Sequence, residues 1–153
     1  MKLSEHFSLF EMTKSQIAIR RGVPNQPNAQ VITHLQAVCE NILEPVRAHY
    51  QTPFSPSSAY RSEMLNRLMG SHNRSQHIRG EAVDFEVPNV STLELAHWIK
   101  DHLEFDQLIL EYFDPERPRS GWVHCSYVEG KNRGRILTIG MGSIKQGLPE
   151  RGA

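Results

Sequence analysis

The sequence predicts an α+β fold, because segments typical of helices dominate roughly the first 70 residues and segments typical of strands dominate the rest. Apolar residues recur at intervals of three and four over residues 28–50, the period of an amphipathic helix. Over residues 82–87 they alternate with polar residues, the period of a strand. With 153 residues the chain suits one domain (residues 1–153), and we expect its core over about residues 7–140 and a flexible tail over residues 141–153.

The first third of the chain is expected to be helical. Ser8 lies three residues before Glu11, which is the spacing of a capping box, so a short helix is predicted to begin there. Thr13 is placed to cap a second short helix. The third helix covers residues 28–50, where Pro45 is expected to kink it or to split off its last turn, because proline lacks the backbone N–H of a helix interior.

Periodicity and turn-forming residues predict the remaining segments. In chain order they are a loop leading into a short strand (51–60), a helix (61–70), a loop (71–80), a strand (82–87), a helix (91–103), a strand (105–113), a loop (114–120) and a hairpin around the turn EGKN (121–140).

The stretch SQHIRGEAVDFEV holds a candidate pair of metal ligands, His77 and Asp84. In the strand pattern Asp84 points away from its apolar neighbours, and in GWVHCSY the side chain of His124 points away from Cys125. If the two strands are neighbours, these three side chains can converge. Two imidazoles and one carboxylate suit one zinc ion and leave a fourth position for water. The alternative is a solvated loop histidine and a strand aspartate bonded to nearby backbone.

Composition narrows the classes of partner. Seventeen basic residues balance seventeen acidic ones, so no large positive field favours nucleic acid. The chain has no apolar run long enough for a membrane span, so no membrane insertion is expected. The segment MKLSEHFSLFEMTKS lacks the apolar region of a signal peptide, which predicts a protein that is cytoplasmic as synthesised. We expect a monomer whose two cysteines are buried, reduced thiols.

Several motifs resemble one family of peptidases. The pattern S-x-H-x-x-G-x-A-x-D is met from Ser75 to Asp84, and W-x-H is met by Trp122, Val123 and His124. This signature is similar to that of the zinc peptidases that include D-alanyl-D-alanine carboxypeptidases, D-Ala-D-Ala dipeptidases and phage L-alanyl-D-glutamate endolysins. The segments SAYRSEMLN, FSLFEMTKS, NILEPVRAHY and NRGRILT also look like this family, the last three like its phage and prophage branch.

The resemblance implies the small α+β fold shared with the hedgehog signalling domain and assigns roles to residues. His77, Asp84 and His124 would be the ligands of one zinc ion. Arg61 would face the scissile carbonyl oxygen or a substrate carboxylate, and Ser75 and Trp122 would bind substrate. Ser75 could instead only cap its loop.

The general base departs from the family pattern. Many relatives carry a glutamate three residues before the last ligand, where this chain has Gly121. The replacement that we expect is Glu111, at the end of a strand that could lie beside the ligand strand. Asp114 and Glu81 are the weaker alternatives, and Glu81 is expected to face solvent.

The function implied is a zinc-dependent peptidase that cleaves peptidoglycan stem peptides at L-Ala–D-Glu or D-Ala–D-Ala type bonds. A phage or prophage endolysin, acting on the cell wall after release, would fit the absence of a signal peptide. The alternative is a non-catalytic zinc-bearing module for binding or virion structure, which Gly121 favours. A hydrolase of ordinary L-peptides is a third possibility, and it leaves the family resemblance unexplained.

Overall fold

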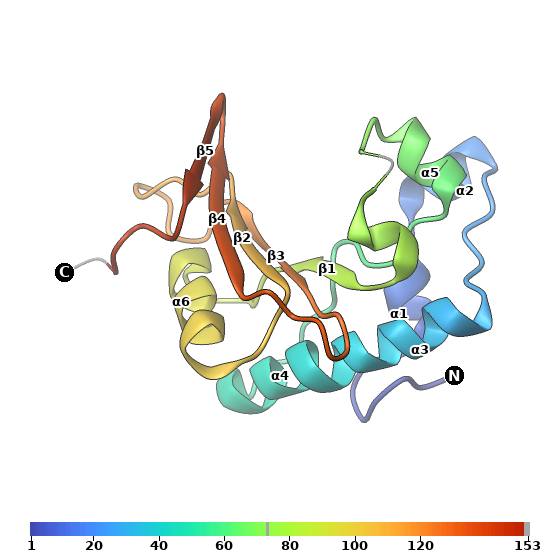
Figure 1. The fold of residues 1–153 in the computed structure, drawn as a ribbon, viewed down its shortest axis with the longest axis horizontal. Coiled ribbons are helices and arrows are strands. Elements are labelled where there is room, and N and C mark those ends of the chain that lie inside the picture. The colour runs from blue at the N-terminus through green and yellow to red at the C-terminus, as the bar shows by residue number, and fades with distance from the viewer. Residues whose placement is uncertain (73, 152–153) are drawn as a thin grey trace.

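The computed structural model describes residues 1–72 and 74–151 (Figure 1). A five-stranded sheet stands between α6 on one side and the group α1, α2 and α5 on the other, while α3 and α4 form a long rod along its base. The α+β prediction is therefore confirmed. The helices are α1 (Leu9–Thr13), α2 (Gln16–Arg21), α3 (Ala29–Val38), α4 (Glu44–Tyr50), α5 (Glu63–Leu68) and α6 (Thr92–His102). The strands are β1 (Ala82–Phe85), β2 (Gln107–Glu111), β3 (Trp122–Ser126), β4 (Arg135–Gly140) and β5 (Ser143–Gln146).

The strand order is β1-β3-β2-β4-β5, and all neighbours are antiparallel except β2 and β4, which are parallel. The predicted hairpin of residues 121–140 is therefore wrong, since β2 lies between β3 and β4. The reason is that the apolar run Leu108–Leu110 is buried best in the interior of the sheet, where both of its edges are paired. The chain crosses the end of β2, where Gly134 N donates to Phe105 O.

The caps explain where the first helices begin. The capping box of Ser8 and Glu11 is present as predicted. The second helix is capped by Ser15, whose hydroxyl accepts from Ala18 N, whereas the Thr13 hydroxyl donates to Leu9 O inside α1. The prediction of Thr13 as the cap is wrong because that residue still belongs to the preceding helix.

The long helical rod is interrupted one turn before the residue that was expected to interrupt it. A π-helical turn, Cys39–Leu43, joins α3 to α4, and Glu44 N donates to Cys39 O five residues back. Pro45 sits in the first turn of α4, where its missing N–H is tolerated. Since Pro45 cannot donate to the carbonyl of Asn41, the shift in hydrogen bonding falls upstream of the proline.

The C-terminal segment is part of the fold. Strand β5 pairs with β4, a ring nitrogen of His97 donates to Pro149 O at 2.7 Å, and Arg151 Nη2 lies 3.1 Å from Asp101 Oδ2. The prediction of a flexible tail is therefore wrong for residues 143–151. Residues 152–153 lie outside the described residues.

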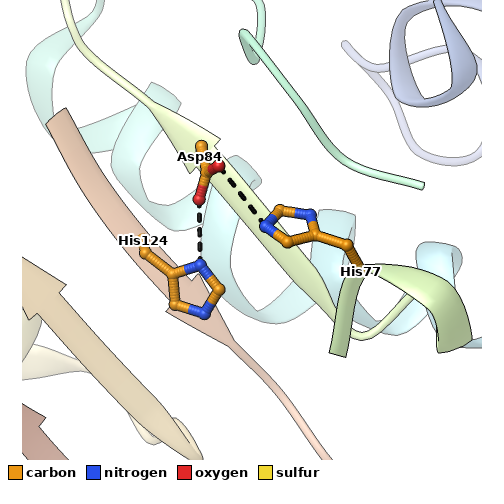
Figure 2. A group of neighbouring side chains, drawn as sticks. All are labelled: His77, Asp84 and His124. Carbon is orange, nitrogen blue, oxygen red and sulfur yellow. Dashed lines mark hydrogen bonds and ion pairs between the residues drawn. The ribbon is translucent and has the colours of Figure 1, made fainter. Parts of the chain in front are cut away.

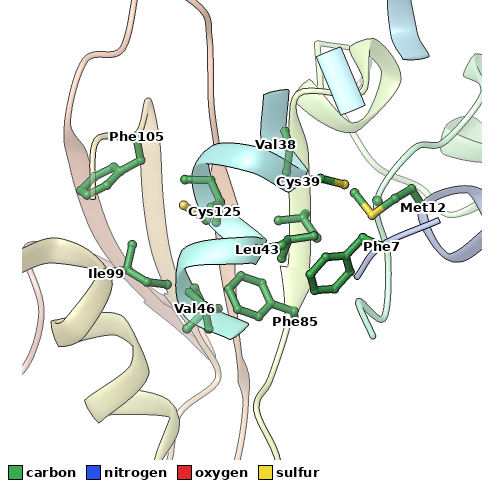
Figure 3. Packing of buried hydrophobic residues seen from close by; sticks show 14 of the residues in the cluster. Phe7, Met12, Val38, Cys39, Leu43, Val46, Phe85, Ile99, Phe105 and Cys125 are labelled. Carbon is green, nitrogen blue, oxygen red and sulfur yellow. The ribbon is translucent and has the colours of Figure 1, made fainter. Parts of the chain in front are cut away.

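The sheet has two unlike faces. Side chains of one face, among them Phe85 and Cys125, pack against the rod of α3 and α4 and against Ile99 of α6 to form the core (Figure 3). Cys39 and Cys125 are buried there as free thiols. The other face carries Asp84 and His124, so strand alternation places the core residues on one face and the candidate metal ligands on the opposite face. No helix within the described ranges is long and apolar enough to span a bilayer.

Candidate metal centre and active-site cleft

The sheet register brings two of the three predicted ligands together. Asp84 of β1 and His124 of β3 are directly opposite each other, and Asp84 Oδ1 lies 2.9 Å from His124 Nδ1 (Figure 2). Directly paired side chains of an antiparallel sheet point to the same face. The predicted convergence of the two strands is thus present in the structure.

A short helical turn directs His77 at the same point. The 3-10 turn Gln76–Arg79 replaces the end of the predicted loop 71–80, and the Ser75 hydroxyl caps it by accepting from His77 N. It ends at Gly80, whose φ is 73°, and an added Cβ there would lie 2.7 Å from Val31 of α3. The turn can therefore approach α3 closely only with glycine at its end. It places His77 Nε2 3.3 Å from Asp84 Oδ2.

The segment before α5 fastens these groups to one another. It was predicted to contain a short strand, but it forms only one bridge to β1, in which Asp84 N donates to Ser58 O. One residue later, Ala59 O accepts from His77 Nδ1 at 2.6 Å. Arg61 N then donates to His77 O. Asp84 and His77 are thus held by three residues of one short segment, Ser58, Ala59 and Arg61.

The three side chains fit a metal ion. One ligand atom from each of His77, Asp84 and His124 lies within 4.8 Å of the others. Because Ala59 O can only accept, His77 Nδ1 carries the proton, and burial lowers the pKa of His77, which favours the neutral ring. The unprotonated Nε2 then faces Asp84.

The state of Asp84 strengthens this fit. Burial raises the pKa of Asp84, but the contact with His124, and that with His77 in its protonated form, outweigh burial and hold that pKa well below its usual range. A carboxylate anion that faces a nitrogen lone pair is repulsive unless a cation lies between them. Histidine ligands typically donate their second ring N–H to a carbonyl, as His77 does here.

Arg61 is buried beside this group with its guanidinium fixed on several sides. Its Nε donates to Ser58 Oγ at 3.1 Å, and its Nη1 donates to Ser71 Oγ at 3.1 Å and to Asn66 Oδ1 at 3.3 Å. Its Nη2 lies 3.5 Å from Asp84 Oδ2. Sequence reasoning did not identify the residues that hold Arg61. Two of them, Ser58 and Asn66, belong to the segment SAYRSEMLN that resembles the peptidase family.

The candidate metal-ligand group lies in an open cleft of about 840 Å³ whose floor follows β2. Ile109 of β2 is paired with His124, and Glu111 is paired with Trp122. Glu111 therefore lies two residues along the strand, about 7 Å from the level of His124. Burial raises the pKa of Glu111, and the charge of Asp84 adds to this, against the opposite influence of His124 and Arg61. Ser75, like the other predicted site residues, lines the cleft.

The backbone explains why a glycine stands at position 121. Gly121 has a φ of 69°, and an added Cβ would lie 2.2 Å from Glu111 O and 2.7 Å from the carbonyl carbon of Tyr112. Tyr112 itself has a φ of 58°, and its ring contacts Trp122 with centroids 5.3 Å apart. A glutamate at this position cannot fit beside the end of β2. The family's usual carboxylate is therefore excluded by packing, and Glu111 is the carboxylate on the cleft floor.

The two weaker base candidates lie elsewhere. Asp114 is bound to Arg117 Nε at 3.2 Å on the following loop. Glu81 is buried and paired with Arg79, so the expectation that it faces solvent is wrong. Neither carboxylate is among the described residues that line the cleft.

An α+β fold with a His-Asp-His group in an open cleft, flanked by a buried arginine and a carboxylate, defines a metallopeptidase type of site. Comparison with family models agrees, since residues 5–126 match Peptidase M15. The chain belongs to the Peptidase M15 family, the zinc-dependent peptidases of the D-Ala-D-Ala carboxypeptidase type. The matched range includes all three candidate ligands, Arg61 and Glu111. No curated protein matches the chain.

Proposed function

We propose that this protein is a zinc-dependent peptidase that hydrolyses peptidoglycan stem peptides at L-Ala–D-Glu or D-Ala–D-Ala type bonds. The observation that carries the proposal is the group of His77, Asp84 and His124 that lines a cleft, in a chain of the Peptidase M15 family. These three residues would hold one zinc ion.

Zinc bound there would supply a Lewis acid and a water whose pKa is lowered to about 7. In the proposed reaction Glu111 accepts the proton of the attacking water and returns it to the leaving amine. Its raised pKa suits this role, because a base works best when its pKa approaches the operating pH. Arg61 donates from Nη2 to the oxygen of the scissile carbonyl as negative charge develops there.

The substrate is proposed to lie across the cleft and to contact Ser75 and Trp122. Both residues line the cleft, and the Ser75 hydroxyl already accepts from His77 N, so its own proton remains available to a substrate oxygen. A monomer that acts on the cell wall after release belongs to the same proposal.

The non-catalytic alternative loses the feature that favoured it. Gly121 suggested a lost base, but the close approach of Glu111 and Tyr112 to Gly121 gives the glycine a packing reason that holds for either function. The cleft retains a carboxylate at Glu111 and a buried guanidinium at Arg61.

The test is a digest of purified peptidoglycan with zinc-loaded protein, read by mass spectrometry. New fragments are expected, their termini naming the bond, and they should disappear after chelation and in the His77→Ala variant, which elemental analysis should find depleted of zinc. His102→Ala, on the exposed surface of α6, is the matched control and should behave like the unchanged protein. Zinc-loaded protein that yields no fragments would contradict the proposal.

A further inference from the structure

The cleft continues past the metal ligands on the side away from Glu111. On β2, Gln107 lies two residues before Ile109, whereas Glu111 lies two residues after it. Since Ile109 is level with His124, the two ends of the cleft floor lie about 7 Å to either side of this ligand. The end at Gln107 is also lined by Gln76 and Arg133.

Arg133 is held at this end by a buried carboxylate. Its Nε lies 2.9 Å from Asp106 Oδ1 and its Nη2 lies 2.8 Å from Asp106 Oδ2, while the backbone N of Arg133 also donates to Oδ1. Asp106 is only 2% exposed, but the Arg133 side chain is 56% exposed. This side-on pairing leaves Nη1 without a hydrogen-bond partner among the described residues.

Gln76 provides a second open group at the same place. Its Nε2 donates to Asp106 Oδ2 at 2.8 Å, which fixes the orientation of the amide. Its Oε1 is buried and has no hydrogen-bond partner within the described ranges. A buried acceptor in this state is unfavourable unless a ligand or a water donates to it. One carboxylate, Asp106, thus positions both an open donor and an open acceptor.

We infer that Arg133 and Gln76 form a substrate subsite for a peptide residue that carries a free carboxylate next to the scissile bond. The carboxylate accepts from Arg133 Nη1, and an N–H of the same residue donates to Gln76 Oε1. The inference rests on the proposed function, since it names what that cleft selects. Asp106 keeps Arg133 in place without blocking Nη1, because the carboxylate occupies only the Nε and Nη2 side.

The charges at this end are balanced, since Arg133 is paired with Asp106 and Arg79 with Glu81. The attraction for a carboxylate therefore comes from the Nη1 donor of Arg133, which points away from the Asp106 contacts. Arg74 lines the same cleft. The competing explanation is that Arg133 only fastens the chain between β3 and β4 to Asp106, and the experiment must separate the two roles.

The experiment measures binding by calorimetry, using zinc-loaded Glu111→Gln protein so that the readout does not depend on turnover. The ligands are a synthetic stem tetrapeptide and a set of derivatives, each with one carboxylate converted to a primary amide. One amidation is expected to weaken binding by about 10-fold or more, the effect of losing a charge-assisted hydrogen bond. Adding Arg133→Gln should abolish that difference, and Arg133→Lys should restore part of it. Arg119→Gln, on an exposed arginine bound to Asn89, is the matched control.

If Arg133→Gln weakens the binding of acid and amide equally, Arg133 is structural and the inference is overturned. The inference is also overturned if the Glu111→Gln protein binds every amidated peptide as tightly as the unmodified tetrapeptide. Failure of the unchanged protein to cleave peptidoglycan would refute the proposed function separately, while the acid–amide difference would still decide the subsite. Gln76→Met, which removes the buried acceptor, should weaken binding of all the peptides through the lost N–H contact.

Discussion

Two buried aspartates, Asp84, which lines the cleft, and Asp106, which binds two cleft-lining side chains, are surrounded in opposite ways. Asp84 faces two imidazoles, with Arg61 Nη2 more distant at 3.5 Å. Asp106 faces the guanidinium of Arg133 through two short contacts and is joined by an amide. Both environments lower the pKa of the carboxyl group.

This difference indicates that the Asp84 group suits a cation, whereas the neighbours of Asp106 suit an organic ligand. An imidazole binds a metal ion in its neutral form, so the Asp84 group can accept a cation between its members. Asp106 already has a permanent positive partner and needs no further cation. What stays open there is a donor and an acceptor on its neighbours, which suit an organic substrate.

The largest expected effect is on zinc content, which should differ between the Asp84→Asn and Asp106→Asn variants. Asp84→Asn should lower zinc affinity by more than about 100-fold, because even changes to groups that merely support a ligand cost about 10–100-fold. Asp106→Asn should keep a full complement of zinc by elemental analysis. Equal zinc loss in both variants would break the comparison.

The next effect tests whether Glu111 is the base on the Asp84 side. Glu111→Gln should retain zinc and lose about 10²–10⁴ in rate, the range that general base catalysis contributes. Because burial raises the pKa of Glu111, the acid limb of the rate–pH profile should lie above the ordinary range for glutamate, and it should vanish from the residual activity of the variant. An unchanged rate would return the role of base to another group.

A third prediction tests whether packing excludes a side chain at Gly121, which would leave Glu111 of β2 as the carboxylate of the cleft. Gly121→Ala should lower the free energy of unfolding by about 2–5 kcal/mol, since it adds a backbone clash to a left-handed conformation. Gly130→Ala is the control, with a φ of 73° and no atom within 4 Å of the added Cβ, and should lose only about 1–2 kcal/mol. Urea denaturation measures both, and equal losses would remove the packing explanation for Gly121.

The smallest effect compares the stability of metal-free protein at two pH values. Asp106→Asn should lower Tm at pH 7, because the contacts of Arg133, and then Gln76, depress the pKa of Asp106 despite its burial. That stabilisation is present above the ordinary pKa of aspartate and is lost as pH falls through the depressed folded value. Glu111→Gln should raise Tm at pH 7, because a carboxylate whose folded pKa is raised becomes destabilising as pH rises through that value.

At low pH, below the ordinary carboxyl pKa, the two differences in Tm should shrink. Circular dichroism melts at both pH values provide the measurement. The same sign of change for both variants at pH 7 would contradict the assigned environments.

The candidate metal ligands could be predicted from sequence because two of them are close in the chain and strand alternation orients the third. His77 and Asp84 lie in one short stretch, and strand alternation puts Asp84 and His124 on the side opposite their apolar neighbours. The resemblance to the peptidase family supplied the pairing of these segments. The larger errors fell where non-local packing decides, as in the hairpin that β2 separates and the tail that forms β5, whereas the Thr13 cap was a local error of two residues.

The sequence by itself determined the α+β class, the helix cap at Ser8 and the candidate metal-ligating residues, because these depend on periodicity and on residues close in the chain. Tertiary structure alone decided that Gly121 excludes a side chain and that Glu111 stands on the cleft floor. It also brought Gln76, Asp106 and Arg133 together from three separate segments. Strand order and loop docking follow from burial of the whole apolar face, which no local pattern encodes.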